Sequence, residues 1–313
     1  MIPIEFALPT FVIGVLFLYK GSDILVDGTA KTAAKLGVSA LIISLVVVAF
    51  GTSAPEFAIS FGAALQNYAD ISIGNIIGSC IANLLLVLGL SAIVRPIHVE
   101  KGIIKREMPI LLGSTALFLV VSFFGLLDTH HKIGGLLFLV VFMVFICYCI
   151  RCAKKERSEN REKYDLGALQ KNILFIVLGI VGVILGAWFL IESAVTIADF
   201  LGIPKLIIAL SMVAIGTSLP ELVVSATAAY KNEADIAVGN VIGSNIFNIY
   251  LILGAAALLI PLNAFVSLHH IVFLLVITAI LIPILYTGYQ ISRKEGIVLL
   301  GLYSVYIWYL FFV

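Results

Sequence analysis

The sequence predicts an all-α integral membrane protein whose ten transmembrane helices form two inverted-topology repeats of five helices. Hydrophobic residues make up 62% of the 313 residues and charged residues 12%, whereas about a quarter of the residues in a soluble domain are charged. Apolar runs such as Leu41–Phe50 and Leu136–Ile150 are continuous rather than alternating, which favours helices over the strands of a barrel. A sequence block that recurs at a fixed spacing predicts the two repeats.

Each predicted span rests on an apolar segment between charged or glycine- and proline-containing loops. A helix needs about 20 such residues to cross the hydrocarbon core of a bilayer. The first segment has no basic residue before Lys20, so it lacks the charged start of a secretory signal and is interpreted as a retained helix. The predicted spans are, in chain order, residues 4–30, 38–66, 71–94, 108–127, 133–151, 172–199, 204–230, 236–260, 267–288 and 296–313.

Basic residues in the predicted loops indicate how the chain is oriented. Loops on one side hold most of the Lys and Arg residues, above all the segment 152–171, whereas loops on the other side hold only Lys132 and Lys205. Because basic loops stay in the cytoplasm, the first side is predicted to be cytoplasmic and both termini extracellular. The domain prediction is a first repeat (1–151), a cytoplasmic linker (152–171) and a second repeat (172–313).

The block Gly-Thr-Ser-x-Pro-Glu occurs at residues 51–56 and again at 216–221, an offset of 165 residues. The offset holds without a gap over a longer stretch. The other matching pairs are Gly21 and Gly186, Gly37 and Gly202, Ser60 and Ser225, Asp70 and Asp235, Gly74-Asn75 and Gly239-Asn240, Gly78-Ser79 and Gly243-Ser244, Asn83 and Asn248, and Gly89 and Gly254. Since five spans per half is an odd number, the second half enters the membrane from the opposite side. Transporters of this design bind their substrate where the two halves meet.

Each copy of the block places a proline inside an apolar span. Pro55 has no N–H to donate to the carbonyl of Gly51, so the helix is expected to bend there. The carbonyls around Ala49, Gly51 and Thr52 are then expected to lack intrahelical partners, and in hydrocarbon they need another partner such as a cation. The second copy repeats this arrangement with Pro220, Ala214, Gly216 and Thr217.

Each copy also buries a carboxylate, Glu56 in the first and Glu221 in the second. A charged residue near the bilayer centre costs roughly 2.5 to 3.5 kcal/mol on insertion scales, so this pair predicts a functional site. Two carboxylates in one buried site repel each other and stay charged only when cations neutralise them. The following spans add oxygens four residues apart on one helix face, and Gly-x-x-x-Gly spacings let the helices approach closely. These residues are Ser79 and Asn83, Ser244 and Asn248, with Gly74 and Gly78, Gly239 and Gly243.

A site made of oxygen ligands suits Ca²⁺ or Na⁺ better than zinc or copper, and protons can also neutralise its carboxylates. An antiporter and a passive cation channel could both be built from it, and the inverted repeat with broken helices favours the antiporter. The first and sixth spans lie outside the site helices and are candidates for the parts that move. The chain has no His-Glu-x-x-His motif, so an enzyme is not predicted. The expected partners are small inorganic cations and the lipid bilayer. A net charge of +1 argues against nucleic acid, and neither a prosthetic group nor a protein partner is indicated.

The two blocks, each followed by Gly-Asn-x-x-Gly-Ser, resemble the alpha repeats of the sodium/calcium exchanger family in the calcium/cation antiporter superfamily, of the prokaryotic type. The motif resemblance covers residues 37–90 and 202–255, and the ten-helix layout extends it over the chain. It implies a multi-pass protein of the cell membrane that exchanges Ca²⁺ for Na⁺ by alternating access.

The resemblance also implies site residues. Glu56 and Glu221 would be ligands shared by Ca²⁺ and Na⁺, and the carbonyls of Thr52 and Thr217 would complete the Ca²⁺ shell. The residues implied for flanking Na⁺ sites are Ser53, Ser79, Asn83, Ser218, Ser244, Asn248 and the carbonyls of Ala49 and Ala214. Some relatives carry an acid at the position of Asn248, so this site has two carboxylates rather than three. The coupling stoichiometry and an H⁺/Ca²⁺ or K⁺-linked exchange therefore stay open.

Overall fold

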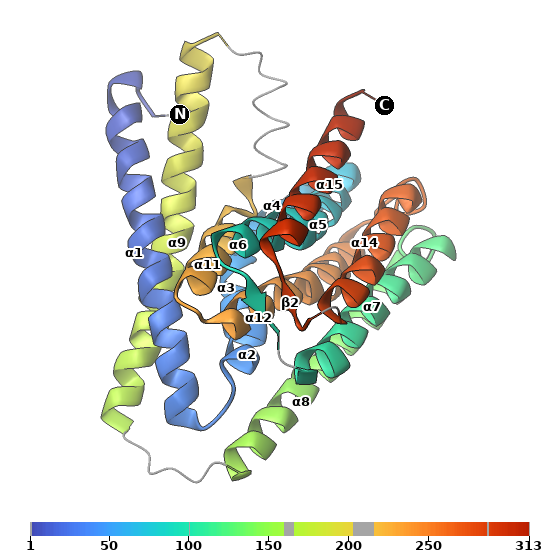
Figure 1. Ribbon diagram of the computed structural model, residues 1–313. Coiled ribbons are helices and arrows are strands. Elements are labelled where there is room, and N and C mark those ends of the chain that lie inside the picture. Colours follow the sequence, from blue (N-terminus) through green and yellow to red (C-terminus); the bar gives the residue numbers. More distant parts are fainter. Residues whose placement is uncertain (1, 100, 160–165, 203–215, 287, 313) are drawn as a thin grey trace.

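The computed structural model describes residues 2–99, 101–159, 166–202, 216–286 and 288–312 (Figure 1). These residues are helical apart from turns, short loops and one ribbon, in which β1 (Ile97–His98) pairs antiparallel with β2 (Gln290–Ile291). The helical elements, with π-helical turns written η, are α1 (Ile4–Leu36), α2 (Ala40–Ile43), η1 (Ser44–Val48), α3 (Ala49–Thr52), α4 (Ala54–Leu65), α5 (Ala69–Ala82), η2 (Asn83–Val87), α6 (Leu88–Val94), α7 (Lys101–Phe123), α8 (His131–Glu159), α9 (Leu166–Phe200), α11 (Leu219–Tyr230), α12 (Ala234–Ile246), η4 (Phe247–Ile252), α13 (Leu253–Leu259), α14 (Leu268–Tyr286) and α15 (Arg293–Phe312).

Within the described ranges, seven helices are long and apolar enough to cross a membrane, and a bent pair, Ala40–Thr52 with Ala54–Leu65, provides an eighth span. They overlap the spans predicted at 4–30, 38–66, 71–94, 108–127, 133–151, 172–199, 236–260 and 267–288. The span predicted at 204–230 lies partly outside the described residues, and α11 covers its end. α15 covers the described part of the span predicted at 296–313, and it begins with the charged residues Arg293, Lys294 and Glu295. The all-helical membrane fold is confirmed, whereas the number of ten spans stays a prediction.

The helices α1 and α9 lie side by side along one edge of the molecule (Figure 1). A Cβ atom added to Gly21 would lie 2.7 Å from the backbone nitrogen of Val183, and one added to Gly186 would lie 2.6 Å from that of Leu18. The two backbones therefore touch along their glycines, which is how small residues let membrane helices pack. Figure 1 also shows the N-terminal end of α1 and the C-terminal end of α15 at the same end of the molecule.

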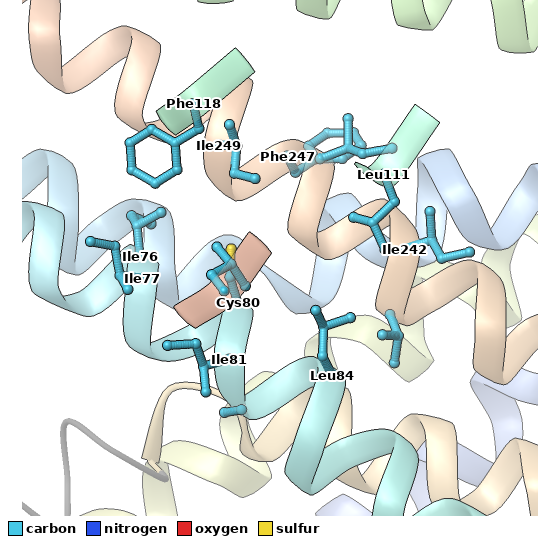
Figure 2. Packing of buried hydrophobic residues seen from close by; sticks show 14 of the residues in the cluster. Ile76, Ile77, Cys80, Ile81, Leu84, Leu111, Phe118, Ile242, Phe247 and Ile249 are labelled. Atoms are coloured by element: carbon cyan, nitrogen blue, oxygen red, sulfur yellow. The ribbon is translucent and has the colours of Figure 1, made fainter. Parts of the chain in front are cut away.

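The centre of the fold is built from two long segments, α5–η2–α6 and α12–η4–α13. In their most apolar stretches 78% and 83% of the residues are buried, compared with 22% for α1, so these two segments form the core. Figure 2 shows part of the buried apolar cluster to which Cys80 and Leu84 belong together with Phe247 and Ile249 of η4 and Phe118 of α7. The outer helices instead expose many large apolar side chains, which fits a protein surrounded by lipid.

The second span bends as the sequence predicts. α3 and α4 meet at Ser53, and the two parts of the span differ in direction by 49°. The expectation that the Ala49 carbonyl lacks an intrahelical partner is wrong, because it accepts a hydrogen bond from the Ser53 N–H at 3.0 Å. The chain changes direction only after Thr52, so the turn that starts at Ala49 closes first.

The connection between the fifth and sixth spans contains more helix than its polar sequence suggests. α8 continues to Glu159, and α9 begins at Leu166. Lys, Arg and Glu are good helix formers, so a charged segment can extend a helix beyond the membrane. The carboxylate of Glu156 accepts a hydrogen bond from the N–H of Ser39 at 2.8 Å, which anchors the end of α8 beside the start of α2.

Close approach through glycine is confirmed for the second Gly-x-x-x-Gly pair. A Cβ on Gly239 would lie 2.9 Å from the carbonyl oxygen of Leu41, and one on Gly243 would lie 2.6 Å from the Cβ of Ala49. No described atom lies within 4 Å of a Cβ placed on Gly74 or Gly78, so close approach at the first pair is not observed.

We expect Gly243→Ala to lower the free energy of unfolding by about 1 to 3 kcal/mol, because the added methyl group would overlap the backbone of Leu45 in η1 and the Cβ of Ala49 in α3. Thermal unfolding in detergent measures this change. Gly113→Ala in α7 is the matched control, since no described atom lies within 4 Å of its added Cβ. A Gly243→Ala protein as stable as the control would contradict the close packing.

Candidate cation site

Two carboxylates lie at the centre of the core. Glu56 is in the first turn of α4 and Glu221 is in the first turn of α11, and both are 0% exposed. Ser53, which belongs to the same block as Glu56, donates a hydrogen bond to Glu221 Oε1, so the two blocks meet at this point. No residue in the described part of the chain forms a salt bridge with either one. The site therefore concentrates two formal negative charges without a basic side chain to balance them.

Serine hydroxyls hold one oxygen of each carboxylate. Ser79 donates to Glu56 Oε1 and Ser244 to Glu221 Oε1, both at 3.4 Å, and Ser53 donates to Glu221 Oε1 at 3.1 Å. The other oxygen, Oε2, has no hydrogen-bond partner among the described residues in either glutamate. Ser218, which corresponds to Ser53 in the repeat, is buried, and its hydroxyl likewise has no described partner. Each carboxylate thus has one oriented oxygen and one open oxygen.

The two threonines of the repeated blocks lie in the same network. The Thr52 hydroxyl donates to Asn240 Oδ1 at 3.0 Å and lies 3.4 Å from the Ser244 hydroxyl. The Thr217 hydroxyl donates to Asn75 Oδ1 at 3.4 Å and lies 3.3 Å from the Ser79 hydroxyl. Each threonine therefore contacts the span that follows the other copy of the block.

Asn75 and Asn240 belong to this network, although the sequence reasoning did not assign them to the site. Asn75 Nδ2 donates to the Ser60 hydroxyl at 2.9 Å and to the backbone carbonyl of Glu56 at 3.4 Å. Asn240 Nδ2 makes the same pair of bonds to Ser225 and Glu221, at 3.0 and 3.4 Å. Both asparagines recur at the 165-residue offset of the repeat, and this recurrence is the sequence feature that could have assigned them to the site. Each asparagine donates a hydrogen bond to the backbone carbonyl of the glutamate in its own half. Each also accepts a hydrogen bond from the threonine hydroxyl of the other half.

Asn83 and Asn248 are also fully buried, but this hydrogen-bond network does not include their side chains. Asn83 begins η2 and Asn248 lies in η4, and π-helical turns occur frequently at functional sites. Neither the oxygen nor the nitrogen of either amide has a hydrogen-bond partner within the described ranges. Ala214, the remaining predicted ligand, lies outside the described residues.

The arrangement can bind hard cations. Carboxylate, hydroxyl, amide and carbonyl oxygens are the ligands that Ca²⁺ and Na⁺ use, and two negative charges are balanced by one Ca²⁺ or by two monovalent cations. Among the residues that the structure describes, no group of three or more His, Cys, Asp or Glu side chains forms a metal cluster. The open oxygens of Glu56 and Glu221 and the unpaired amides are buried, so a desolvated cation would supply their missing partner.

A cavity of about 470 Å³ reaches the site from one side. It lies between α4 and α9, where Pro55 and Ile59 face Trp188 and Glu192, and it extends to Thr217. Because the hydroxyl of Thr217 lies 3.3 Å from that of Ser79, the cavity ends next to the network around Glu56.

These features define a helical membrane protein with two buried carboxylates in an oxygen-lined candidate cation site at its core. The family described as sodium/calcium exchanger protein matches residues 6–151 and 171–312, and the chain belongs to this family.

Individual relatives match over most or all of the chain. The sodium/calcium exchanger MaX1 of Methanosarcina acetivorans is 36% identical over 100% of both chains, and the inner membrane protein YrbG of Escherichia coli is 35% identical over 80% of this chain and 79% of its own. A solved structure of the sodium-calcium exchanger NCX_Mj, soaked with 10 mM Na⁺ and zero Ca²⁺, is 34% identical. It covers 97% of this chain and 99% of its own, with a TM-score of 0.86.

Proposed function

We propose that the protein exchanges Ca²⁺ for Na⁺ across the cell membrane by alternating access. The observation that carries the proposal is the pair Glu56 and Glu221, which are 0% exposed, have no described salt bridge and each keep one open carboxylate oxygen. Leaving two buried charges without cations costs several kcal/mol, so the empty site does not cross between its two states easily. A site that changes sides only when occupied must trade one cation load for another, and the bound cations shift the population of states.

The relatives support Na⁺ as the counter-ion. MaX1 and NCX_Mj are both named as sodium/calcium exchangers, and this chain covers 100% and 99% of their lengths. Two carboxylates accommodate either one Ca²⁺ or two Na⁺ by charge alone. Additional Na⁺ ions would need neutral ligands, for which the buried amides of Asn83 and Asn248 are suited.

The proposed architecture is ten spans in two inverted repeats, residues 1–151 and 172–313, with both termini extracellular and residues 152–171 in the cytoplasm. The support comes from contacts that occur in pairs at the repeat offset. Thr52 meets Ser244 as Thr217 meets Ser79, at 3.4 and 3.3 Å. Such pairing is expected where two halves related by a two-fold axis share one site.

The proposed ligands divide by chemistry. The carboxylates of Glu56 and Glu221 bind both ions, and the carbonyls of Thr52 and Thr217 contribute to the Ca²⁺ shell. The Na⁺ ligands are Ser53, Ser79, Asn83, Ser218, Ser244, Asn248 and the carbonyls of Ala49 and Ala214. Asn75 and Asn240 orient the threonines and the glutamate backbones through the hydrogen bonds described above.

The function is tested in proteoliposomes by measuring Ca²⁺ uptake while Na⁺, K⁺ and pH gradients are imposed separately. An outward-directed Na⁺ gradient is expected to drive Ca²⁺ uptake, and the K⁺ and pH gradients are not. Uptake that follows the pH gradient and ignores Na⁺ would indicate H⁺/Ca²⁺ exchange instead. Ca²⁺ flux that needs no counter-ion on the opposite side would indicate a passive channel.

A further inference from the structure

One serine of the site lies between two acceptors that belong to different halves of the chain. Ser244 Oγ is 3.4 Å from Glu221 Oε1, the carboxylate of its own half, and also 3.4 Å from Thr52 Oγ1 of the first half. All three residues are buried. A serine hydroxyl has a single hydrogen, so Ser244 can donate to only one of these two oxygens at a time.

The hydrogen of the Thr52 hydroxyl is already engaged. Asn240 Nδ2 donates to the backbone carbonyl of Glu221, which can only accept, so Asn240 Oδ1 faces Thr52 and accepts its hydrogen at 3.0 Å. The other oxygen near this hydroxyl, the carbonyl oxygen of Ala49 at 3.3 Å, is also only an acceptor. Toward Ser244, Thr52 Oγ1 can therefore act only as an acceptor.

The same arrangement occurs in the other half. Ser79 Oγ lies 3.4 Å from Glu56 Oε1 and 3.3 Å from Thr217 Oγ1, and Thr217 donates to Asn75 Oδ1 at 3.4 Å. Asn75 is held by the backbone carbonyl of Glu56, as its counterpart is held in the second half. Each serine thus has a second acceptor, and in both cases the threonine of the opposite half provides it.

A bound cation changes which acceptor the serine can use. In the empty site the carboxylate takes the serine hydrogen, because hydrogen bonds to a charged acceptor are the stronger ones. When the serine oxygen binds a cation, its hydrogen must point away from that positive charge. Thr52 Oγ1 is the second acceptor within reach of Ser244, and without it the hydrogen would be buried and unpaired, which is unfavourable.

We propose that Thr52 and Thr217 are positioning residues for Na⁺. Each accepts the hydrogen of the serine in the opposite half and so turns the oxygen of that serine toward the ion. This inference rests on the proposed function, because it takes Ser79 and Ser244 as Na⁺ ligands. Since the carbonyls of the same threonines are the proposed Ca²⁺ ligands, the hydroxyl groups affect Na⁺ binding and the carbonyl groups affect Ca²⁺ binding.

The test measures how Na⁺ displaces radioactive Ca²⁺ from the purified protein at equilibrium in detergent. Thr52→Val keeps the shape and the carbonyl and removes only the hydroxyl. Loss of one hydrogen bond weakens the affected Na⁺ site about fivefold, which appears as about a twofold rise in the half-displacing Na⁺ concentration when two Na⁺ ions replace one Ca²⁺. The double variant with Thr217→Val is expected to raise this concentration about fivefold. The Ca²⁺ dissociation constant without Na⁺ should change less than about twofold in either protein.

Two variants serve as controls. Thr52→Ser restores the hydroxyl and is expected to recover most of the lost Na⁺ affinity. Thr278→Val in α14 removes a buried hydroxyl that donates to the carbonyl of Leu274 in its own helix at 2.8 Å, and it should leave both affinities unchanged. If Thr52→Val and Thr217→Val both behaved like Thr278→Val, the positioning role would be overturned. Equal weakening of Na⁺ and Ca²⁺ binding would also overturn it, because that result indicates a general structural effect.

Double variants test the crossed pairing directly, because residues that act through each other do not have additive effects. Thr52→Val is expected to cause no further loss of Na⁺ affinity in a Ser244→Ala protein, but its full loss in a Ser79→Ala protein. Thr217→Val should show the reverse pattern. A threonine effect of the same size in both serine backgrounds would contradict the proposal.

The two proposals fail in different ways. A wild-type protein whose bound Ca²⁺ is not displaced by Na⁺ would contradict the proposed function, and the positioning role would fall with it. Normal displacement by Na⁺ in the wild type, together with unaltered displacement in both threonine variants, would leave the exchange function standing and overturn only the positioning role.

Discussion

Replacing Glu221 by Gln is expected to abolish Na⁺-driven Ca²⁺ uptake. The substitution keeps an oxygen that can accept the hydrogen bonds from Ser53 and Ser244, but it removes one of the two buried charges. A bound Ca²⁺ would then leave an uncompensated positive charge in the core, and breaking a buried ion pair in this way costs about 3 to 5 kcal/mol. Ca²⁺ affinity should fall by roughly two to three and a half orders of magnitude, because each 1.4 kcal/mol is a factor of ten. Glu56→Gln should have the same effect.

The measurement is Ca²⁺ uptake into proteoliposomes together with calorimetric titration of Ca²⁺ in detergent. Glu107→Gln is the matched control, since Glu107 on α7 is only 3% exposed and lies outside the hydrogen-bond network of the site. It should transport Ca²⁺ at close to the wild-type rate. If Glu221→Gln and Glu107→Gln retained equal uptake, the assignment of Glu221 as a ligand would be wrong.

The second large effect is expected from Asn248→Asp, which adds a third carboxylate to the site. Both amide atoms of Asn248 are buried and have no hydrogen-bond partner among the described residues, so the new charge would be as desolvated as those of the glutamates. We expect Ca²⁺ to bind about tenfold more tightly, equivalent to about 1.4 kcal/mol. Turnover should fall at the same time, because tighter binding acts mainly by slowing release.

Calorimetric titration and the dependence of uptake on Ca²⁺ concentration measure the two effects separately. Asn248→Ser serves as the control, because it keeps a neutral oxygen at the same position and should not tighten Ca²⁺ binding. Ca²⁺ affinity that does not differ between Asn248→Asp and the wild type would place residue 248 away from the bound cation.

The hydrogen-bond network orients the carboxylates of the proposed cation site. In each glutamate, Oε1 is held by a serine while Oε2 stays open, so the carboxylate is oriented before the cation arrives. Thr52 and Thr217 link the two halves. Each donates a hydrogen bond to an asparagine of the other half, and that asparagine binds the backbone carbonyl of the glutamate in its own half. Such preorganisation reduces the ordering that binding would otherwise require.

The sequence by itself determined the local features of this protein. Apolar segments of membrane-spanning length predicted the helices, because hydrocarbon solvates neither charges nor open backbone groups. Pro55 predicted the bend of the second span, since a residue without an N–H interrupts the helix. The two copies of one block predicted which carboxylates, Glu56 and Glu221, would be buried in the core.

Only the tertiary structure decided which groups pair across the fold. In the tertiary structure, the Ala49 carbonyl accepts a hydrogen bond from Ser53 before the span bends. Asn75 and Asn240 each accept a hydrogen bond from the threonine in the other copy of the block. The tertiary structure also brought Lys231 to Asp23, although more than 200 residues separate them. These pairings depend on where distant segments meet, and periodicity along the chain describes only each segment's own environment. Buried polar groups must find partners wherever packing places them, so the partners become known only when the packing is known.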